Sequence, residues 1–324
     1  MTTHRGHLGI YAGTANPELA ADVAQRLGQP LGKLVVKRFS DGEVHVQIEQ
    51  SIRGQDVYII QSTCPPVNEN LMELLVIADA FHRASAGNIT LIIPYYGYAR
   101  QEKKATGREP ITAKMVADLL TTVGADRVVS IDLHAPAIQG FFNIAMDHLT
   151  AVPIIINHLL PRLRPDQVIV SPDVGRVKLA DSFSRALDIP LVVLHKRRAG
   201  HEQAEIRGVV GDVADKSPII IDDMISTGGT MAEAVQAVLG AGARPEIAIA
   251  AVHPLLVGPA IERLKHPAIK EVIVTDTIPV PPEKRLGKLS ILSVAGLLAE
   301  TIHRLHENRS ISALFPPRYD THPV

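Results

Sequence analysis

The sequence predicts an α/β fold of two similar domains, each a mainly parallel sheet flanked by helices. Short apolar runs, most of them continuous rather than alternating, are separated by helical patterns along nearly the whole chain of 324 residues. Continuous apolar strands between helices are typical of parallel sheets that are covered on both faces. The two halves also share strand ends: residues 92–97 and 170–175 end in Pro-x-x-Gly, and residues 129–132 and 219–222 end in an acid. The halves therefore look like diverged copies of one α/β unit.

The first half begins with elements that fit this pattern. Its continuous apolar runs predict strands at residues 8–12, 33–37, 56–60, 89–93 and 127–131. Apolar side chains at helical spacing predict helices at residues 70–83 and 113–122. Residues 44–48 differ, because apolar and polar side chains alternate there, and we expect a half-exposed strand of an antiparallel ribbon.

The second half repeats the alternation of strands and helices. Apolar runs predict strands at residues 168–170, 191–194, 219–221, 247–251 and 271–274. Helices are expected at residues 178–187, 231–239 and 294–306, and the last has an apolar stripe and Ser293 as its expected N-cap. A boundary near residues 149–153 gives domains of residues 1–149 and 150–324. The C-terminal helix is a candidate to cross back to the first domain.

Composition excludes several classes of protein. Hydrophobic residues make up 46% of the chain and charged residues 21%, which is typical of a globular protein and not of a disordered one. The formal net charge of −1 gives no broad electrostatic footprint for nucleic acid. A single cysteine, Cys64, excludes an internal disulfide and fits a reducing compartment. Without an apolar signal region or a membrane-spanning run, we expect a cytoplasmic protein with no membrane partner.

One strand-turn-helix stretch, residues 218–230, organises the predicted chemistry. The strand at residues 219–221 is followed by two acids, Asp222 and Asp223, whose carboxylates can accept hydrogen bonds from sugar hydroxyls or hold a metal. The turn consists of Ser226, Thr227, Gly228, Gly229 and Thr230. Its glycines let backbone N–H groups and a helix N-terminus converge on one phosphate. The stretch predicts a phosphorylated pentose as ligand; the alternative is a tight βα turn with only a packing role.

Two stretches in the first half are candidates for a nucleotide. Asp41 and Glu43 flank Gly42 in a turn before the half-exposed strand, and their carboxylates could accept hydrogen bonds from an adenine amino group and its ribose. The alternative is a solvated hairpin turn. Arg100 and Gln101 follow three tyrosines in a loop, and they suit a nucleotide's phosphates and base edge. The alternative there is a surface loop of packed tyrosines.

Two further stretches suit a metal and a cationic lid. His134 and Asp173 follow strands in the two halves and could together hold a divalent cation. Because Mg²⁺ prefers oxygen ligands, a structural role for His134 competes with this hypothesis. Lys196, Arg197 and Arg198 follow a strand and could form a mobile lid that neutralises charge on transferring phosphates. Elsewhere such a run would be a solvated charged surface.

Taken together, these motifs resemble those of the ribose-phosphate pyrophosphokinase family, whose domains are of the phosphoribosyltransferase type. The similarity extends from Leu8 to Phe315. It is carried by residues 39–43, 61–65, 70–74, 96–101, 132–134, 139–142, 171–175, 196–198, 222–230 and 274–279. The resemblance implies Mg²⁺-dependent transfer of the β,γ-diphosphoryl group of ATP to the anomeric hydroxyl of ribose 5-phosphate, with release of AMP. It also implies homo-oligomers, commonly hexamers.

The resemblance further implies roles for single residues. The implied ATP contacts are Asp41, Gly42, Glu43, Arg100 and Gln101, the first three reaching in from a neighbouring subunit. Lys196 and Arg198 would be the catalytic cations, and His134 and Asp173 the Mg²⁺ ligands. The implied ribose 5-phosphate contacts are Arg198, Asp222, Asp223, Ser226, Thr227, Gly228, Gly229 and Thr230. Ser51 and Arg53 match positions of the family's phosphate/ADP regulatory site.

The sequence departs from the family pattern at a few positions. Position 226 is usually Asp in the best-known members and is Ser here. Pro136 and Ala137, residues 200–203 in the lid, and residues 176–178 after Asp173 are also less usual. Two alternative functions would also have the loop at residues 222–230. One is a phosphoribosyltransferase, which would need a base pocket, and the other is a catalytically silent regulatory homologue. Loss of the lid lysine or of the acidic pair would mark the silent class, and both are present.

Overall fold

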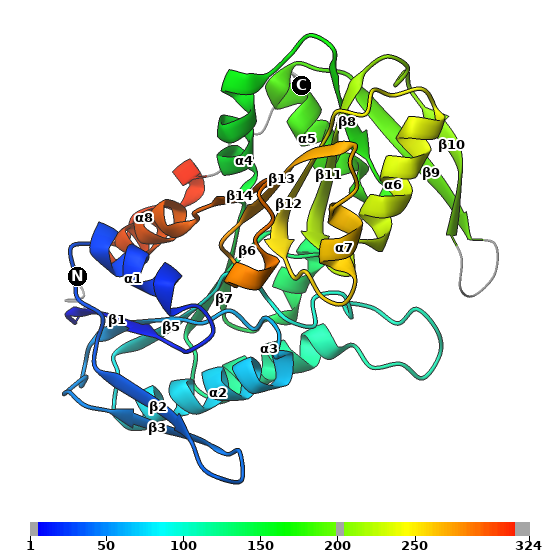
Figure 1. The fold of residues 1–324 in the computed structure, drawn as a ribbon. Helices are drawn as coiled ribbons and strands as arrows, with labels where there is room; N and C mark the ends of the chain where they lie inside the picture. The colour runs from blue at the N-terminus through cyan, green and yellow to red at the C-terminus, as the bar shows by residue number, and fades with distance from the viewer. Residues whose placement is uncertain (1–5, 199–203, 315–324) are drawn as a thin grey trace, which may run out of the picture. The chain divides into compact units, whose positions relative to one another are not determined.

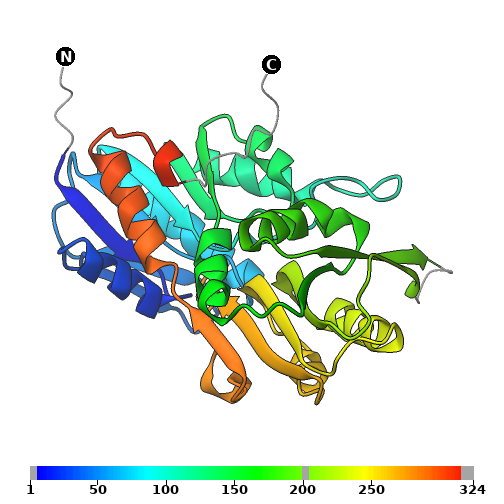
Figure 2. The same ribbon diagram turned by 90° about the horizontal axis from the view of Figure 1, so that it is seen from above.

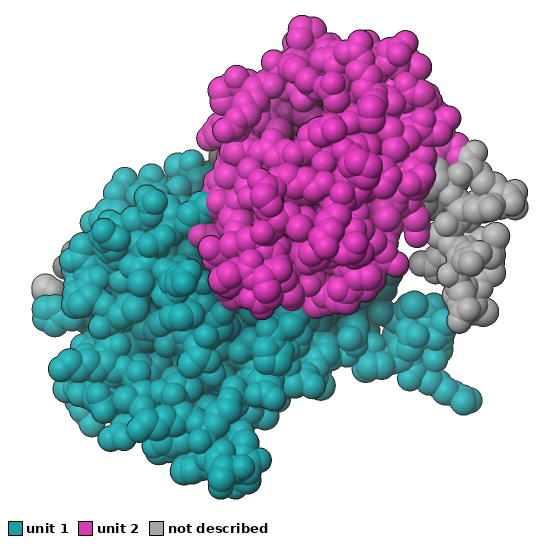
Figure 3. Space-filling view, in the orientation of Figure 1, with its two compact units in different colours: residues 1–150, 293–324 teal, residues 151–292 magenta. Residues whose placement is uncertain are grey.

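The structure is a computed structural model that describes residues 6–198 and 204–314, with the side chains of residues 196–198 and 204–207 outside the description. The chain divides into two compact units, Met1–Thr150 with Ser293–Val324, and Ala151–Leu292 (Figure 3). Each unit contains a mainly parallel sheet with helices on its faces (Figure 1), so the predicted α/β class is confirmed. Among the described helices, none has the length and apolar character needed to cross a membrane.

The first unit contains a five-stranded sheet in the order β1-β4-β5-β6-β7, and all its pairs are parallel. Its strands are β1 (Leu8–Ala12), β4 (Asp56–Ile60), β5 (Asn88–Ile93), β6 (Arg127–Ile131) and β7 (Ala145–Leu149). Every residue of β4 is buried, which explains its continuous apolar sequence. The edge strand β7 was not predicted. It contains Asp147, whose carboxylate pairs with Arg127 on the neighbouring strand at 2.5 Å.

An antiparallel ribbon accompanies this sheet. β2 (Leu34–Arg38) pairs with β3 (Val44–Ile48), with Leu34 opposite Ile48 and Arg38 opposite Val44. Partly buried and exposed residues alternate along β3, as its sequence predicts. The apolar side chains of the ribbon pack against the core cluster of the unit, and β3 lies against helix α2 (Val67–Arg83).

Four helices of the described residues cover the first sheet. α2 and α3 (Thr112–Thr122) contribute to the main core cluster, while α1 (Pro17–Arg26) and α8 (Ala295–His306) pack against each other. α1 was not predicted, although Asn16 caps it by accepting a hydrogen bond from Leu19 N at 3.3 Å. The expected N-cap of α8 was wrong: Val294 occupies that position, and the Ser293 hydroxyl accepts from Ala295 N at 3.2 Å.

The second unit contains a seven-stranded sheet in the order β10-β9-β8-β11-β12-β13-β14. Its strands are β8 (Gln167–Ser171), β9 (Leu191–Arg198), β10 (Ala204–Val210), β11 (Ser217–Ile225), β12 (Ile247–Pro254), β13 (Ile269–Thr275) and β14 (Leu289–Leu292). Only the β9–β10 pair is antiparallel among the described pairs of this sheet. All nine residues of the central strand β11 are buried. β11 continues beyond the predicted residues 219–221, so Asp222 and Asp223 lie within the strand.

Helices lie on both sides of this sheet (Figure 2). α6 (Gly229–Gly240) and α7 (Ala260–Leu264) share one core cluster with the sheet, and α5 (Val177–Leu187) packs on β8 and β11. α4 (Val152–Leu159) contacts α5. Parallel strands place their carboxyl ends along one edge, so the segments after β8 and β11 meet there.

Candidate active site

The two acids of β11 are buried and share one cationic partner. Asp222 is 7% exposed and Asp223 6%, and the backbone N of Asp223 donates to Asp222 Oδ1 at 2.8 Å. Arg176, which ends the short 3₁₀ helix η3 (Val174–Arg176) after β8, reaches both carboxylates. Its Nε lies 3.2 Å from Asp222 Oδ1, and its Nη2 lies 3.1 Å from Asp223 Oδ2. The only signal of this contact in the sequence was an unusual residue after Asp173.

Burial makes it costly in free energy to keep both carboxylates ionised. Removal from water raises the pKa of Asp222 well above its usual range, the neighbouring Asp223 carboxylate raises it further, and Arg176 acts in the opposite direction. Two adjacent carboxylates with little access to water need hydrogen-bond donors and positive charge if both are to stay ionised. The arrangement can therefore accept hydroxyl donors from a ligand that enters beside Arg176.

The turn after β11 is held by a neighbouring segment of the same unit. Val257 N donates to Ser226 O at 3.0 Å, and Arg263 Nη1 donates to Thr227 O at 2.8 Å. Gly228 is the N-cap of α6, with φ of 72°, and a Cβ there would lie 3.3 Å from Ala260 Cα. Glycine therefore fits both the backbone conformation and the close approach.

The amino end of α6 has the properties of an anion site. No described side chain caps this helix, because Gly228 stands at the N-cap position. Its first N–H groups have no acceptor within the helix and carry the positive end of the helix dipole. Ser226 and Thr230 are partly buried, Thr227 is exposed, and all three lie on this turn beside Gly229. The turn can thus bind a phosphate, as the sequence predicts for residues 226–230.

Asp173 lies near the same sheet edge, after β8. It caps η3, and its Oδ1 accepts from Arg176 N at 3.1 Å. His134 follows β6 in the first unit and is partly buried, so the structure assigns the two expected metal ligands to different units. Mg²⁺ in phosphate-transfer sites takes one or two carboxylates and completes its shell with water and substrate oxygens. One carboxylate, Asp173, fits that requirement, and no group of three or more His, Cys, Asp or Glu suited to a metal occurs among the described residues.

The tyrosine-rich loop after β5 holds Gln101 firmly and leaves Arg100 exposed. Tyr96 is 2% exposed and donates from its hydroxyl to Ala113 O at 3.0 Å, so it packs as a structural residue. Gln101 Oε1 accepts from Thr112 Oγ1 at 2.6 Å at the start of α3. Arg100 is exposed and is not held in this way. The loop therefore presents a cation beside an anchored amide.

The hairpin turn between β2 and β3 is closed and exposed. Glu43 N donates to Asp41 Oδ1 at 3.1 Å, and Gly42 adopts φ of 96°. Phe39, which precedes the turn, is 54% exposed. At the end of β2 next to the turn, Arg38 Nη2 lies 3.4 Å from Glu69 on α2. Asp41 and Glu43 are exposed, so their carboxylates can contact a ligand or another chain.

The remaining predicted residues lie apart from these groups or outside the description. Ser51 and Arg53 are exposed in the connection between β3 and β4 of the first unit. The backbones of Lys196 and Arg198 lie in β9, opposite Ile206 and Ala204 of β10, and their side chains lie outside the described part.

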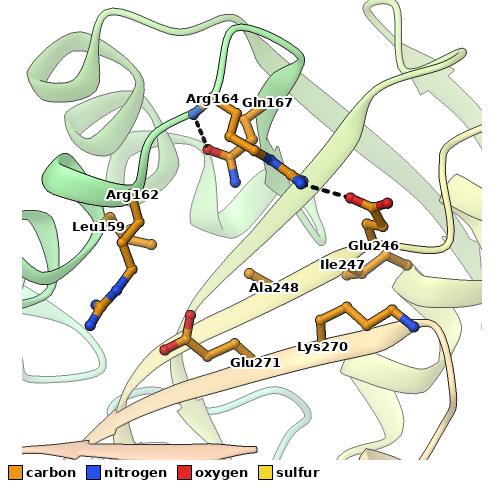
Figure 4. Close-up of a pocket in the computed structure, with 9 residues that line it drawn as sticks. All are labelled: Leu159, Arg162, Arg164, Gln167, Glu246, Ile247, Ala248, Lys270 and Glu271. Carbon is orange, nitrogen blue, oxygen red and sulfur yellow. Dashed lines mark hydrogen bonds and ion pairs between the residues drawn. The ribbon is translucent and has the colours of Figure 1, made fainter.

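A pocket of about 440 Å³ lies elsewhere in the second unit (Figure 4). It is at the amino ends of β8, β12 and β13, and none of the predicted site residues lines it. Arg164 already has protein partners there: its Nη1 contacts Glu246 Oε2 at 2.8 Å, and its backbone N donates to Gln167 Oε1 at 2.9 Å (Figure 4). Ligands of parallel α/β sheets bind at the opposite, carboxyl edge.

Comparison with known proteins gives matches along the whole chain. Residues 8–124 match the family model of the N-terminal domain of ribose phosphate pyrophosphokinase, and residues 198–316 match the phosphoribosyl synthetase-associated domain. Ribose-phosphate pyrophosphokinase of Caldanaerobacter subterraneus subsp. tengcongensis is 52% identical over 97% of this chain and 100% of its own length. The Bacillus subtilis protein of that name is 50% identical over 95% of this chain and 97% of its own length.

A solved structure gives the same result for the fold. The crystal structure of phosphoribosylpyrophosphate synthetase from Mycobacterium smegmatis superimposes with a TM-score of 0.88 at 44% identity. The match covers 93% of this chain and 99% of that chain. The similarity therefore includes both units.

Proposed function

Because the chain belongs to the ribose-phosphate pyrophosphokinase family, we propose that it transfers the β,γ-diphosphoryl group of ATP to ribose 5-phosphate, giving 5-phosphoribosyl 1-pyrophosphate and AMP. The observation at the site that supports this function most strongly is the buried pair Asp222 and Asp223, which lie in β11 shortly before the glycine turn at the amino end of α6. Carboxylates suit the hydroxyls of a pentose, and the turn suits its 5-phosphate.

The second unit would bind the sugar. The N–H groups at the start of α6 and the hydroxyls of the turn hold the 5-phosphate, while Asp222 and Asp223 accept hydrogen bonds from the ring hydroxyls. This fixes the anomeric hydroxyl relative to the incoming phosphate. Its oxygen bonds to the β-phosphorus of ATP as the bond from that phosphorus to the α,β-bridging oxygen breaks. AMP leaves with that oxygen, and the hydroxyl proton is released.

Two sets of cations would handle the charge of this reaction. Lys196 and Arg198 neutralise the negative charge that grows on the transferring phosphates. Asp173 and His134 would hold Mg²⁺, which when bound reduces the repulsion among phosphate oxygens. In the first unit, the exposed Arg100 binds phosphates and Gln101 contacts the base edge of ATP.

Assembly and location belong to the same proposal. The exposed carboxylates of Asp41 and Glu43 and the exposed Phe39 support contact with an adjacent chain, so the hairpin would complete a neighbour's ATP site in a homo-oligomer, by family likeness a hexamer. Ser51 and Arg53 would bind the regulatory phosphate or ADP. We place the enzyme in the cytoplasm, where nucleotide biosynthesis uses its product.

One assay tests the proposed reaction. Purified protein is incubated with Mg²⁺, ATP and ribose 5-phosphate, and AMP and the pyrophosphorylated sugar are quantified. We expect equal amounts of both products, and neither when ribose 5-phosphate is omitted. Release of AMP without an added nucleobase separates this activity from that of a phosphoribosyltransferase. No AMP release by the assembled protein would favour the silent regulatory homologue.

A further inference from the structure

The structure assigns Arg176 a role in substrate positioning: we propose that its guanidinium fixes Asp222 and Asp223 in the arrangement that receives the ribose hydroxyls. This inference rests on the proposed function, because it concerns the sugar site of that reaction. Arg176 is a positioning residue here, since it acts through the two carboxylates and not on the reacting atoms.

Arg176 contacts the two carboxylates through two of its nitrogens, as a planar fork, and not through a single ion pair. Nε of Arg176 lies 3.2 Å from Asp222 Oδ1, and Nη2 lies 3.1 Å from Asp223 Oδ2. Two donors of one rigid plane therefore set the relative orientation of two carboxylates. Arg176 and the Asp223 amide both contact Oδ1 of Asp222, which fixes the orientation of that carboxylate.

The backbone of Arg176 is fixed as well. Its N–H donates to Asp173 Oδ1 at 3.1 Å, and it is the last residue of η3, immediately before α5. The side chain of Arg176 is 18% exposed, compared with 10% and 8% for those of Asp222 and Asp223. A side chain anchored at its base and paired at its tip has little freedom to swing away. Arg176 therefore links Asp173 after β8 to the acids of β11.

Charge explains why the pair needs this residue. Two adjacent buried carboxylates repel each other, and loss of their counter-ion would leave negative charge without compensation. One carboxyl would then be free to turn away, and it would lose its value as an acceptor for a hydroxyl. A lysine could supply the charge, but its single ammonium lacks the planar fork that sets both orientations.

Two variants separate positioning from simple charge compensation. Arg176→Gln removes the charge and the fork, and Arg176→Lys keeps the charge alone. Arg185→Gln is the matched control, because Arg185 lies on α5, pairs with Asp181 at 2.9 Å and has a side chain that is 52% exposed. Initial rates are measured against ribose 5-phosphate and against ATP, together with melting temperatures.

We expect Arg176→Gln to raise KM for ribose 5-phosphate about 10- to 100-fold, because Asp222 and Asp223 would no longer be oriented to accept hydrogen bonds from the ribose hydroxyls. KM for ATP should change less than about twofold. Arg176→Lys should regain the melting temperature of the natural protein and still show KM for ribose 5-phosphate raised about 5-fold or more. The control should match the natural protein in all three quantities.

Other outcomes overturn the proposal. If Arg176→Lys has the same KM for ribose 5-phosphate as the natural protein, Arg176 acts only as a counter-ion and does not position the carboxylates. A fall in kcat with both KM values unchanged would mean that Arg176 contacts the transferring phosphates. If Arg176→Gln does not fold, Arg176→Lys alone decides. If the natural protein releases no AMP, the proposed function fails, and calorimetric titration of ribose 5-phosphate into the same proteins still decides: equal affinity of the natural protein and Arg176→Lys overturns positioning.

Discussion

The catalytic assignment of Lys196 makes a prediction at the scale of one side chain. We expect Lys196→Ala to lower kcat about 100- to 10,000-fold, because a cation that neutralises charge in the transition state acts mainly on that step. KM for both substrates should change little. Steady-state kinetics on the purified variant measure this, with circular dichroism to show that it is folded.

Lys265→Ala provides the control for Lys196. Lys265 is 55% exposed, it pairs with Glu262 at 2.8 Å, and it lies away from the acids of β11 in the sequence. We expect this variant to retain the activity of the natural protein. Turnover near that level in Lys196→Ala would remove Lys196 from the catalytic residues.

Ser226 makes a second prediction at this scale. A hydroxyl in the turn can donate to a phosphate oxygen, and loss of such a bond costs about 1–2 kcal/mol. We therefore expect Ser226→Ala to raise KM for ribose 5-phosphate about 5- to 30-fold, with kcat and KM for ATP little changed. The alternative, a capping role, has less support because Gly228 is the N-cap of α6. A lower melting temperature with normal kinetics would nevertheless decide for a structural role.

Single residues differ in how far the sequence could identify them. Asp222 and Asp223 were found because they follow an apolar run and precede a glycine turn, and both signals are local. Arg176 was not, because the target of a long side chain on another strand has no signature in linear spacing. Tyr96 shows a partial success: the sequence allowed packed tyrosines in this loop, and the structure shows a buried Tyr96 that donates from its hydroxyl to Ala113 O.

At the scale of elements, α8 offers a test of how the C-terminal segment is held. His306 Nδ1 lies 2.7 Å from Asp56 Oδ2 on β4, and Asp56 is 1% exposed. His306→Ala would remove a partner from a buried carboxylate, at a cost of about 1–3 kcal/mol. We expect a melting temperature lower by a few degrees and unchanged KM values.

His303→Ala is the control for this element. His303 lies on the same helix, its side chain is 44% exposed, and it pairs with Glu307 at 3.4 Å. Exposed pairs of this kind contribute little to stability, so its melting temperature should stay within about one degree. Equal effects of the two substitutions would mean that the contact with Asp56 does not hold α8.

Elements were predictable where their apolar pattern is continuous. β4 and β11 are buried along their whole length, and their sequences show it. The edge strand β7 was missed because Asp147 and His148 interrupt its apolar pattern, and an edge position tolerates them. β11 was predicted too short, since Asp222 and Asp223 indicated a turn, whereas pairing with Arg176 allows them to stay buried in the strand.

At the scale of the whole molecule, the hairpin β2–β3 carries the proposal that an adjacent chain completes the ATP site. Its turn presents the exposed carboxylates of Asp41 and Glu43 beside Phe39, a large apolar side chain that is 54% exposed. Arg38, the last residue of β2 before the turn, lies 3.6 Å from the buried carboxylate of Glu73, which holds the turn end of β2 to α2. An exposed apolar side chain beside an anchored strand end is suited to contact with another copy of the chain.

Mixed oligomers test whether this hairpin serves a neighbouring chain. A variant with Asp41→Ala and Glu43→Ala lacks the hairpin contacts, and Lys196→Ala lacks the catalytic cation. If the hairpin acts on an adjacent subunit, an active site in a mixed assembly can combine the intact lysine of one chain with the intact hairpin of the other. We expect each variant alone to be nearly inactive and the dissociated and reassembled mixture to regain part of the activity. Mass measurement must show that mixed assemblies form, and their inactivity would mean that the hairpin completes the site of its own chain.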